Sequence, residues 1–179
     1  MKIALTGGIA CGKSLLSKFL NELGVETLDA DDVVHEIIPD PAERRRIAAE
    51  VFADPAKRKE LEAKIHPIVK ERIEKFFDER GGRVMSDVLR VAIIPLLFEV
   101  HWEKNFDIIS CVVSKRESQI DRMVTTRLMT RAEAEARLAA QLPVEEKAKR
   151  SHYVIHNDGS PEELKAKAKA FVDWLRAKL

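Results

Sequence analysis

The chain alternates short apolar runs with longer segments of helical character. The apolar runs predict buried strands over residues 2–6, 25–29, 91–96, 106–113 and 153–156. Helical spacing of apolar residues, closed by Gly24, predicts a helix over residues 13–23. Strands that are apolar throughout and separated by helices are typical of a parallel sheet with helices on both faces. We therefore expect ligands to bind beyond the carboxyl ends of the strands.

Three later helix starts carry the signature of a capping box, in which a hydroxyl and a glutamate three residues further on satisfy each other's free amides. The pairs are Ser114 with Glu117, Thr130 with Glu133, and Ser160 with Glu163. They predict helices near residues 115–126, 131–141 and 161–178. Proline at the first helical position strengthens the third start.

Residues 31–78 read as a long helical region that prolines interrupt, at Pro39, Pro41, Pro55 and Pro67. Proline disfavours helical geometry in the residue before it, so we expect His66 to leave the helix and turn its ring toward a pocket. A structural role is the commoner one for a lone histidine, and the composition gives no reason to prefer a catalytic one.

Composition restricts the function classes. The 179 residues suffice for one domain with a real core and a small appended lobe. The 31 basic and 30 acidic side chains leave a net charge of +1, which argues against a general nucleic-acid binder. Two cysteines are too few for a disulfide framework or a metal-ligand pattern and indicate a reducing compartment. Apolar runs too short for a bilayer and no visible secretory signal lead us to expect a cytoplasmic protein without a membrane partner.

The segment GGIACGKS, from Gly7 to Ser14, fits the phosphate-loop pattern G-x-x-x-x-G-K-[ST] between a predicted strand and a predicted helix. Glycines let successive backbone N–H groups turn toward phosphate oxygens, and the helix start adds its positive dipole end. We expect Lys13 to reach the outer phosphates of a nucleoside triphosphate and Ser14 to bind Mg²⁺. A glycine turn with a surface lysine is the alternative, but it does not explain why pattern, spacing and context agree.

Cys11 lies inside this loop. Positive surroundings would lower the pKa of its thiol and make it reactive, so that a bulky thiol reagent would block nucleotide binding. A small filler is the commoner role of a loop cysteine, and we favour it.

The stretch LDADD, residues 28–32, puts three acids at the end of the second predicted strand. One carboxylate there suits a general base that accepts a proton from an attacking hydroxyl. A helix N-cap, with acids favoured by the helix dipole, is the alternative, and the two roles can fall on different acids.

Arginines gather in residues 115–150, at Arg116, Arg122, Arg127, Arg131, Arg137 and Arg150. Planar, permanently charged groups on a mobile flap over the nucleotide suit a transferred phosphoryl group. For any single arginine we favour a solvated helix face, and the alternation of Arg131 and Arg137 with Glu133 and Glu135 fits surface pairing.

The chain resembles the dephospho-CoA kinase family, which transfers the γ-phosphoryl group of ATP to the ribose 3′-hydroxyl of dephospho-CoA. The matching segments follow the family order and cover most of the chain: LTGGIACGKS (5–14), LDADD (28–32), VFADPAKRKELEAKIHPIV (51–69), IPLLFE (94–99), QIDRMVTTR (119–127), TRAEAEARLAAQ (130–141) and VIHNDGS (154–160). Many families share the phosphate loop, but its combination with D-A-D, H-P and P-L-L-F-E is much more specific.

The resemblance implies an α/β fold of the P-loop NTPase type, with three layers (α/β/α) around a five-stranded parallel sheet. It divides the chain into a nucleotide-binding core (1–30, 84–126 and 150–179), a helical substrate lobe (31–83) and a small helical lid (127–149). It implies ATP and Mg²⁺ as cofactors and dephospho-CoA as the small-molecule partner, and we expect a monomer.

The resemblance also implies roles for single residues. Catalysis falls to Asp31, Lys13 and Arg137, with Asp31 as the base for the 3′-hydroxyl. The ATP site falls to Gly8, Ala10, Cys11, Gly12, Lys13, Ser14, Leu15, Arg127 and Asn157, with Ser14 as the Mg²⁺ ligand and Asn157 near the adenine. The substrate side falls to Asp31, His66, Pro67, Leu97 and Glu99. Without the resemblance, the leucines and the phenylalanine of PLLFE (95–99) would be read as ordinary core residues.

Two other functions stay open at the level of the sequence. One is a P-loop kinase for another small nucleotide or hydroxyl substrate. The other is a nucleotide-dependent switch, which would carry N-K-x-D at a late strand end where this chain has IHND. The chain also departs from the family where its loop reads A-C-G-K-S-L instead of G-S-G-K-S-T, and between Glu36 and Arg44, where it is shorter.

Overall fold

The computed structural model describes residues 1–78 and 88–179, which belong to two compact units. One unit contains residues 1–27 and 88–179, and the other contains residues 28–78. The boundary expected at residues 83 and 84 lies outside the described residues.

A five-stranded parallel sheet organises the first unit, with the strand order β2-β3-β1-β4-β5, and β2 crosses the boundary into the second unit. The strands are β1 (Ile3–Gly7), β2 (Glu26–Asp29), β3 (Arg90–Ile93), β4 (Ile108–Val113) and β5 (Tyr153–His156). β1 is central, and its Leu5 is in register with Ile93 on one side and Ser110 on the other. All residues of β1 and β4 are buried, which confirms the expectation of a sheet covered on both faces.

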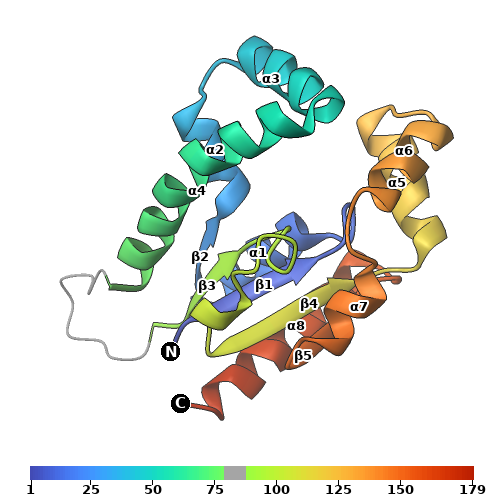
Figure 1. Ribbon diagram of the computed structural model, residues 1–179. Coiled ribbons are helices and arrows are strands. Elements are labelled where there is room, and N and C mark those ends of the chain that lie inside the picture. Colours follow the sequence, from blue (N-terminus) through green and yellow to red (C-terminus); the bar gives the residue numbers. More distant parts are fainter. Residues whose placement is uncertain (79–87) are drawn as a thin grey trace. The chain divides into compact units, whose positions relative to one another are not determined.

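Helices cover this sheet (Figure 1). They are α1 (Lys13–Glu22), α7 (Val144–Lys149) and α8 (Pro161–Arg176), and a 3₁₀ turn spans Glu103–Asn105. Two more helices, α5 (Arg116–Arg127) and α6 (Arg131–Ala139), pack against each other and stand off the sheet in Figure 1. α1 packs against α8, whereas α7 packs on β1 and β4. In Figure 1, α8 lies behind the sheet and α7 in front of it, so the strands are enclosed between two helical layers.

Apolar side chains at helical spacing explain this packing. Leu16, Phe19 and Leu20 form the buried face of α1, and five residues do so in α8: Leu164, Ala168, Phe171, Val172 and Leu175. Both sets join the strand residues in one core cluster. α1 ends just before Gly24, whose φ of 79° is the left-handed geometry predicted for its stop signal.

The second unit is helical, with α2 (Ala30–Ile37), α3 (Pro41–Ala53) and α4 (Pro55–Asp78). Prolines separate these helices as predicted, because α3 and α4 both begin at a proline. The predicted break at Pro67 is wrong, since α4 continues through it. Burial of Ile65, Val69 and Ile73, one turn apart on one face of α4, explains how packing overrides the local penalty of the proline.

Two of the three predicted hydroxyl caps are present. Thr130 forms the complete capping box with Glu133, and Ser160 accepts a hydrogen bond from the amide of Glu163. The prediction at Ser114 is wrong, because α5 has Lys115 as its N-cap without a side-chain cap. The hydroxyl of Ser114 instead donates to the carbonyl of Asn157 at 2.7 Å.

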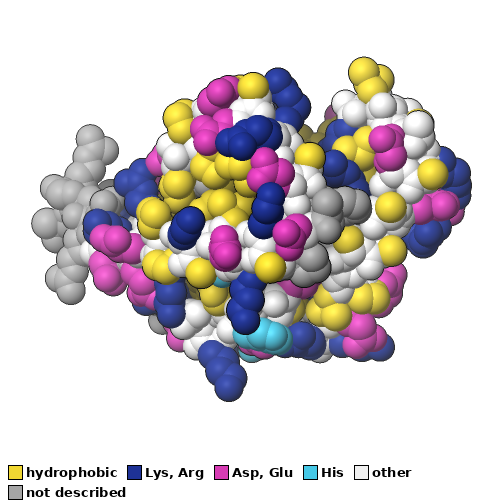
Figure 2. Space-filling view, turned by 45° about the horizontal axis from the view of Figure 1, so that its top comes forward, with side chains coloured by type: hydrophobic (Ala, Val, Ile, Leu, Met, Phe, Trp, Pro, Cys, Tyr) yellow, Lys and Arg dark blue, Asp and Glu magenta, His cyan; other side chains and the backbone are white. Residues whose placement is uncertain are grey.

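Charges of both signs are interspersed on the face drawn in Figure 2, as the near balance of acidic and basic residues predicts. Within residues 1–78 and 88–179, no helix combines the length and the apolar character that crossing a membrane requires.

Candidate active site

The loop between β1 and α1 requires glycine at two positions, Gly7 and Gly12. Gly12, the N-cap of α1, has a φ of 92°, and a Cβ atom there would lie 2.2 Å from Nδ2 of Asn157. A Cβ atom on Gly7 would lie 2.4 Å from the carbonyl oxygen of Val112. Ala10 also adopts a positive φ, of 57°, which is unfavourable for a residue with a side chain. The glycines of the motif are therefore steric requirements of this turn.

Lys13 and Ser14 begin α1, directly after the turn. The ammonium group of Lys13 donates to the carbonyls of Gly7 and Gly8, at 3.2 and 2.9 Å, which holds the charge over the loop. The side chains of Ser14 and Leu15 are exposed, so the Ser14 hydroxyl is open to a ligand. A positive charge, a hydroxyl and a helix N-terminus thus meet at one place, which is an anion site of the kind that binds nucleotide phosphates.

Cys11 is fully buried behind this loop. Burial raises the pKa of its thiol, and the opposite pull of the Lys13 charge is the smaller effect. The filler role is therefore the one that fits, and Cys11 can offer a ligand only its backbone. Asn157, predicted near the adenine, is also buried, and its Nδ2 donates to the carbonyl of Cys11 at 2.8 Å.

The acids of the LDADD stretch divide between two roles in the second unit. Asp29 is the N-cap of α2, where its carboxylate accepts the amide N–H of Asp31 at 2.9 Å. Asp31 and Asp32 lie in the first turn of that helix with exposed side chains. One acid of the stretch therefore serves as the cap, and the carboxylate of Asp31 is left accessible.

His66 and Pro67 both lie inside α4, so the expectation that His66 leaves the helix is wrong. The histidine is half-buried and Pro67 is exposed. Tertiary packing of α4 therefore overrides the local preference that the residue before proline has for extended geometry.

The segment after β3 shows residues whose roles the sequence did not reveal. Leu97 is fully buried, so it supports the core instead of offering a surface to a ligand. Glu99 accepts the amide N–H of Leu142 at 3.1 Å and pairs with Lys147 at 2.8 Å. Lys147 is fully buried and also donates to the carbonyl of Pro95. Nothing in the sequence marks this lysine, since its neighbours in α7 are ordinary charged residues.

The arginines of α5 and α6 lie in different environments. Arg131 pairs with Glu117 and Glu135, which is the surface pairing considered above. Arg127 and Arg137 are exposed, in the last turns of α5 and α6. Both are accessible to a ligand from solvent.

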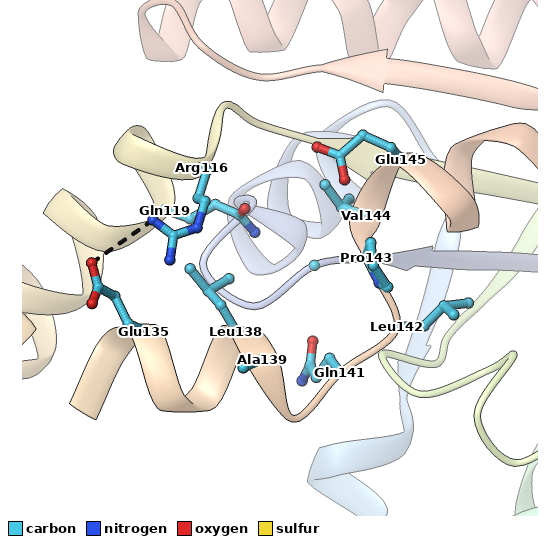
Figure 3. A pocket seen from close by; sticks show the side chains of 11 residues that line it. Arg116, Gln119, Glu135, Leu138, Ala139, Gln141, Leu142, Pro143, Val144 and Glu145 are labelled. Carbon is cyan, nitrogen blue, oxygen red and sulfur yellow. Dashed lines mark ion pairs between the residues drawn. The ribbon is translucent and has the colours of Figure 1, made fainter. Parts of the chain in front are cut away.

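A pocket of about 230 Å³ adjoins the phosphate loop at Gly8 (Figure 3). Side chains of α5, of α6 and of the segment that leads into α7 line it, among them Gln119, Leu138 and Leu142. Arg116 and Glu135 form an ion pair across it, at 3.8 Å. The first unit therefore has a hollow between the phosphate loop and the predicted lid segment.

Comparison with known proteins agrees with this geometry. A sequence model of the family described as dephospho-CoA kinase matches residues 1–43 and 40–163. A dephospho-CoA kinase of Synechococcus sp. (strain JA-3-3Ab) is 36% identical over 205 residues, which cover 93% of this chain and 89% of the relative. The crystal structure of TT1252 from Thermus thermophilus superposes with a TM-score of 0.80 at 31% identity, covering 98% of this chain and 97% of that one. The dephospho-CoA kinase from Campylobacter jejuni, at 23% identity, shares the fold with a TM-score of 0.70 and covers 99% of each chain.

Proposed function

The chain belongs to the dephospho-CoA kinase family, and we propose that Lys13, Asp31 and the lid arginines carry its reaction, the final step of coenzyme A biosynthesis. In this reaction the γ-phosphoryl group of ATP passes to the ribose 3′-hydroxyl of dephospho-CoA. The observation that carries the assignment of residues is the phosphate loop, where the Lys13 ammonium, the Ser14 hydroxyl and the α1 N-terminus converge.

The loop binds the triphosphate of ATP in this proposal. Backbone N–H groups of Gly8, Ala10 and residues 12–15 face the phosphate oxygens, while the N–H of Cys11 donates to the carbonyl of Gly8. Lys13 exchanges its contacts with loop carbonyls for the outer phosphates. Ser14 would hold Mg²⁺, and an exposed hydroxyl oxygen suits an ion that takes most of its remaining ligands from phosphates and water. The ion, when bound, neutralises charge on the phosphate oxygens.

Asp31 is the base in this proposal. Its carboxylate accepts the proton of the 3′-hydroxyl as the sugar oxygen forms a bond to the γ-phosphorus. The bond from that phosphorus to the bridging oxygen breaks, and ADP leaves with the electron pair. Capping of α2 by Asp29 supports this assignment, because it leaves the Asp31 carboxylate uncommitted to the backbone.

The remaining roles follow the family division of the chain. The second unit holds dephospho-CoA, with His66 and Pro67 on the substrate side. Glu99, also assigned to the substrate side, lies in the first unit and acts through the backbone that it holds. Residues 127–149 form the lid, from which Arg127 and Arg137 neutralise the transferred phosphoryl group. The enzyme acts as a monomer in the cytoplasm.

An acceptor assay tests the function. The purified protein is incubated with ATP and Mg²⁺ and with dephospho-CoA, adenosine, shikimate or no acceptor, and ADP release is followed together with the mass of the product. We expect ADP release with dephospho-CoA at a rate at least about a hundredfold above the other mixtures. Equal rates with and without dephospho-CoA would overturn the function.

Asp31→Asn tests the base. The amide has the size of the carboxylate but does not accept the proton, so we expect kcat to fall about 100- to 10,000-fold while the Kd for ATP stays within about twofold. Asp32→Asn is the matched control, because Asp32 is also exposed in the same helical turn. Near-normal turnover of Asp31→Asn, or equal losses in both variants, would contradict the assignment.

A further inference from the structure

Side chains from distant elements hold three consecutive carbonyls of the phosphate loop. The carbonyls of residues 9, 10 and 11 accept hydrogen bonds, at 2.7, 3.1 and 2.8 Å, from Nε2 of Gln119, Nη1 of Arg122 and Nδ2 of Asn157. Gln119 and Arg122 lie on α5, and Asn157 directly follows β5. We call these three side chains the loop brace.

The loop brace fixes the direction of the peptide groups. A peptide is planar and trans, so a carbonyl that is held on one side directs the N–H of the next residue to the opposite side. The tied carbonyls of residues 9 and 11 therefore turn the N–H groups of Ala10 and Gly12 toward the concave side of the loop, where an anion binds, whereas the N–H of Cys11 closes the turn by donating to the carbonyl of Gly8 at 3.3 Å. The backbone needs this support, because Ala10 is held at a φ of 57°, which costs about 1–2 kcal/mol.

The brace is itself rigid. Gln119 and Asn157 are buried, with exposed fractions of 2% and 6%. Arg122 joins them, since its Nη1 also donates to the hydroxyl of Ser114 at 3.0 Å and its Nη2 to the carbonyl of Asn157 at 2.8 Å. The brace thus connects the ends of β4 and β5 with the loop that follows β1.

Two glycines of the motif leave room for the brace. A Cβ atom on Gly8 would lie 2.5 Å from Nε2 of Gln119, and one on Gly12 would lie 2.2 Å from Nδ2 of Asn157. These are the very atoms that hold the loop carbonyls. The glycines and the bracing amides therefore occupy complementary positions.

We infer that Gln119, Arg122 and Asn157 are positioning residues that hold the phosphate loop in its anion-binding form before the nucleotide arrives. Asn157 acts through the loop and not by contacting the adenine. A loop ordered in advance loses less conformational freedom on binding, so the brace raises affinity for the phosphate chain. This inference rests on the proposed function only in taking ATP as the ligand of the loop.

Asn157→Asp and Gln119→Glu test the brace. Each replaces a donor amide by an acceptor of the same size, which faces a carbonyl that it cannot bind. Loss of one such hydrogen bond is worth about 1 kcal/mol or more, so we expect the Kd for ATP to rise at least about fivefold in each variant. Titration with ATP and Mg²⁺ in the absence of any acceptor measures this change. Asp121→Asn, at an exposed position on α5, is the control and should leave the Kd within about twofold.

Inorganic tripolyphosphate separates the loop from the adenine. It carries the phosphate chain without a base, so the brace predicts that its inhibition constant rises by the same factor as the Kd for ATP, whereas an adenine contact would affect ATP alone. KM for dephospho-CoA should stay unchanged while KM for ATP rises. Arg122→Lys keeps one donor and serves as the milder variant if thermal melting shows that the others do not fold.

Folded variants that bind ATP within about twofold of the wild type, or that weaken ATP but not tripolyphosphate, would overturn the inference. Because binding is measured without acceptor, failure of the wild type to phosphorylate dephospho-CoA would contradict the proposed function and leave this test intact.

Discussion

At the residue scale, the two cysteines show how burial decides chemistry that the sequence leaves open. Cys11 and Cys111 are both fully buried. Burial raises the pKa of both thiols, and for Cys111 it does so to about 12. The positive charge of the phosphate loop does not activate Cys11, because desolvation is the larger effect. We expected a thiol reagent to block nucleotide binding only if Cys11 is accessible. Because the thiol is buried, that condition is not met.

The raised pKa of Cys111 predicts a loss of stability at alkaline pH. Below its ordinary value of 9.0 the thiol is neutral in both states, whereas between 9.0 and about 12 the unfolded chain releases a proton that the folded protein keeps. The free energy of unfolding therefore falls as the pH rises, with a limiting slope for one thiol of about 1.4 kcal/mol per pH unit. Urea unfolding at several alkaline pH values measures it. Cys111→Ala should have a shallower slope, and equal slopes in both proteins would contradict the prediction.

The phosphate loop also shows what one sequence can and cannot reveal at this scale. Its motif identifies Lys13 and Ser14 because their spacing follows from the shape of one turn. The partners of the loop carbonyls are 110 residues away at Gln119 and 146 residues away at Asn157, and no local pattern links them to the loop. Buried Lys147 was missed for the same reason, since only the folded chain brings it to Glu99.

At the element scale, helix ends follow local rules unless a tertiary partner competes. The hydroxyl of Thr130 forms the predicted capping box with Glu133 at the start of α6. Ser114 lies at the end of β4, where the carbonyl of Asn157 attracts its hydroxyl, and α5 begins without that cap. Pro67 illustrates the same competition, because packing of α4 outweighs the local preference for a break. Local rules thus predict which helices exist better than they predict where the helices end.

Thr130→Ala should destabilise α6. The substitution removes the hydroxyl that accepts the amide N–H of Glu133 and contacts its carboxylate, so we expect a loss of about 1 kcal/mol in the free energy of unfolding. Faster hydrogen exchange of the first amides of α6 would locate the effect. Thr125→Ala is the control, because that hydroxyl bonds within α5 to the carbonyl of Asp121 and alanine suits a helix interior.

The pH offers a second check of the same cap. Hydrogen bonds from Thr130 lower the pKa of Glu133, so its carboxylate stabilises the cap above the ordinary value of 4.5 and loses this effect as the pH falls through the lowered pKa. Exchange at the start of α6 should accelerate over that acid range in the wild type and less in Thr130→Ala, which loses the hydroxyl but keeps the backbone N–H that is the larger cause of the lowered pKa. Equal acceleration in both would contradict the role of the box.

At the scale of the whole molecule, the sheet order is the part of the fold that no strand encodes alone. The apolar runs predict the strands and their parallel direction, but not that β1 lies between β3 and β4. That position places the loop after β1 beside the ends of β4 and β5, where Ser114 and Asn157 join it. The site is therefore a product of the topology, and the family resemblance implied five parallel strands but not their order.

One buried ion pair joins several of these segments. Lys147 of α7 reaches Glu99 and the carbonyl of Pro95, which also accepts the hydroxyl of Thr6 in β1. Glu99 in turn holds the amide of Leu142, in the segment that returns from α6. The other oxygen of Glu99 is buried without a hydrogen-bond partner among the described residues. The ammonium group of Lys147 is therefore the main compensation for the cost of burying the charge of Glu99.

Removing that ammonium should leave a buried carboxylate without its charge partner. We expect Lys147→Met, which keeps the length of the side chain, to lower the free energy of unfolding by about 3 kcal/mol in urea titration. Lys149→Met is the matched control on the same helix, since its pair with Glu146 is exposed to solvent and should contribute little to the free energy of unfolding. Adding Glu99→Gln to Lys147→Met should recover part of the loss, because the remaining amide carries no charge to desolvate. Similar small losses in both lysine variants would mean that the segments around β1 are held by apolar packing alone, and that Glu99 does not depend on Lys147.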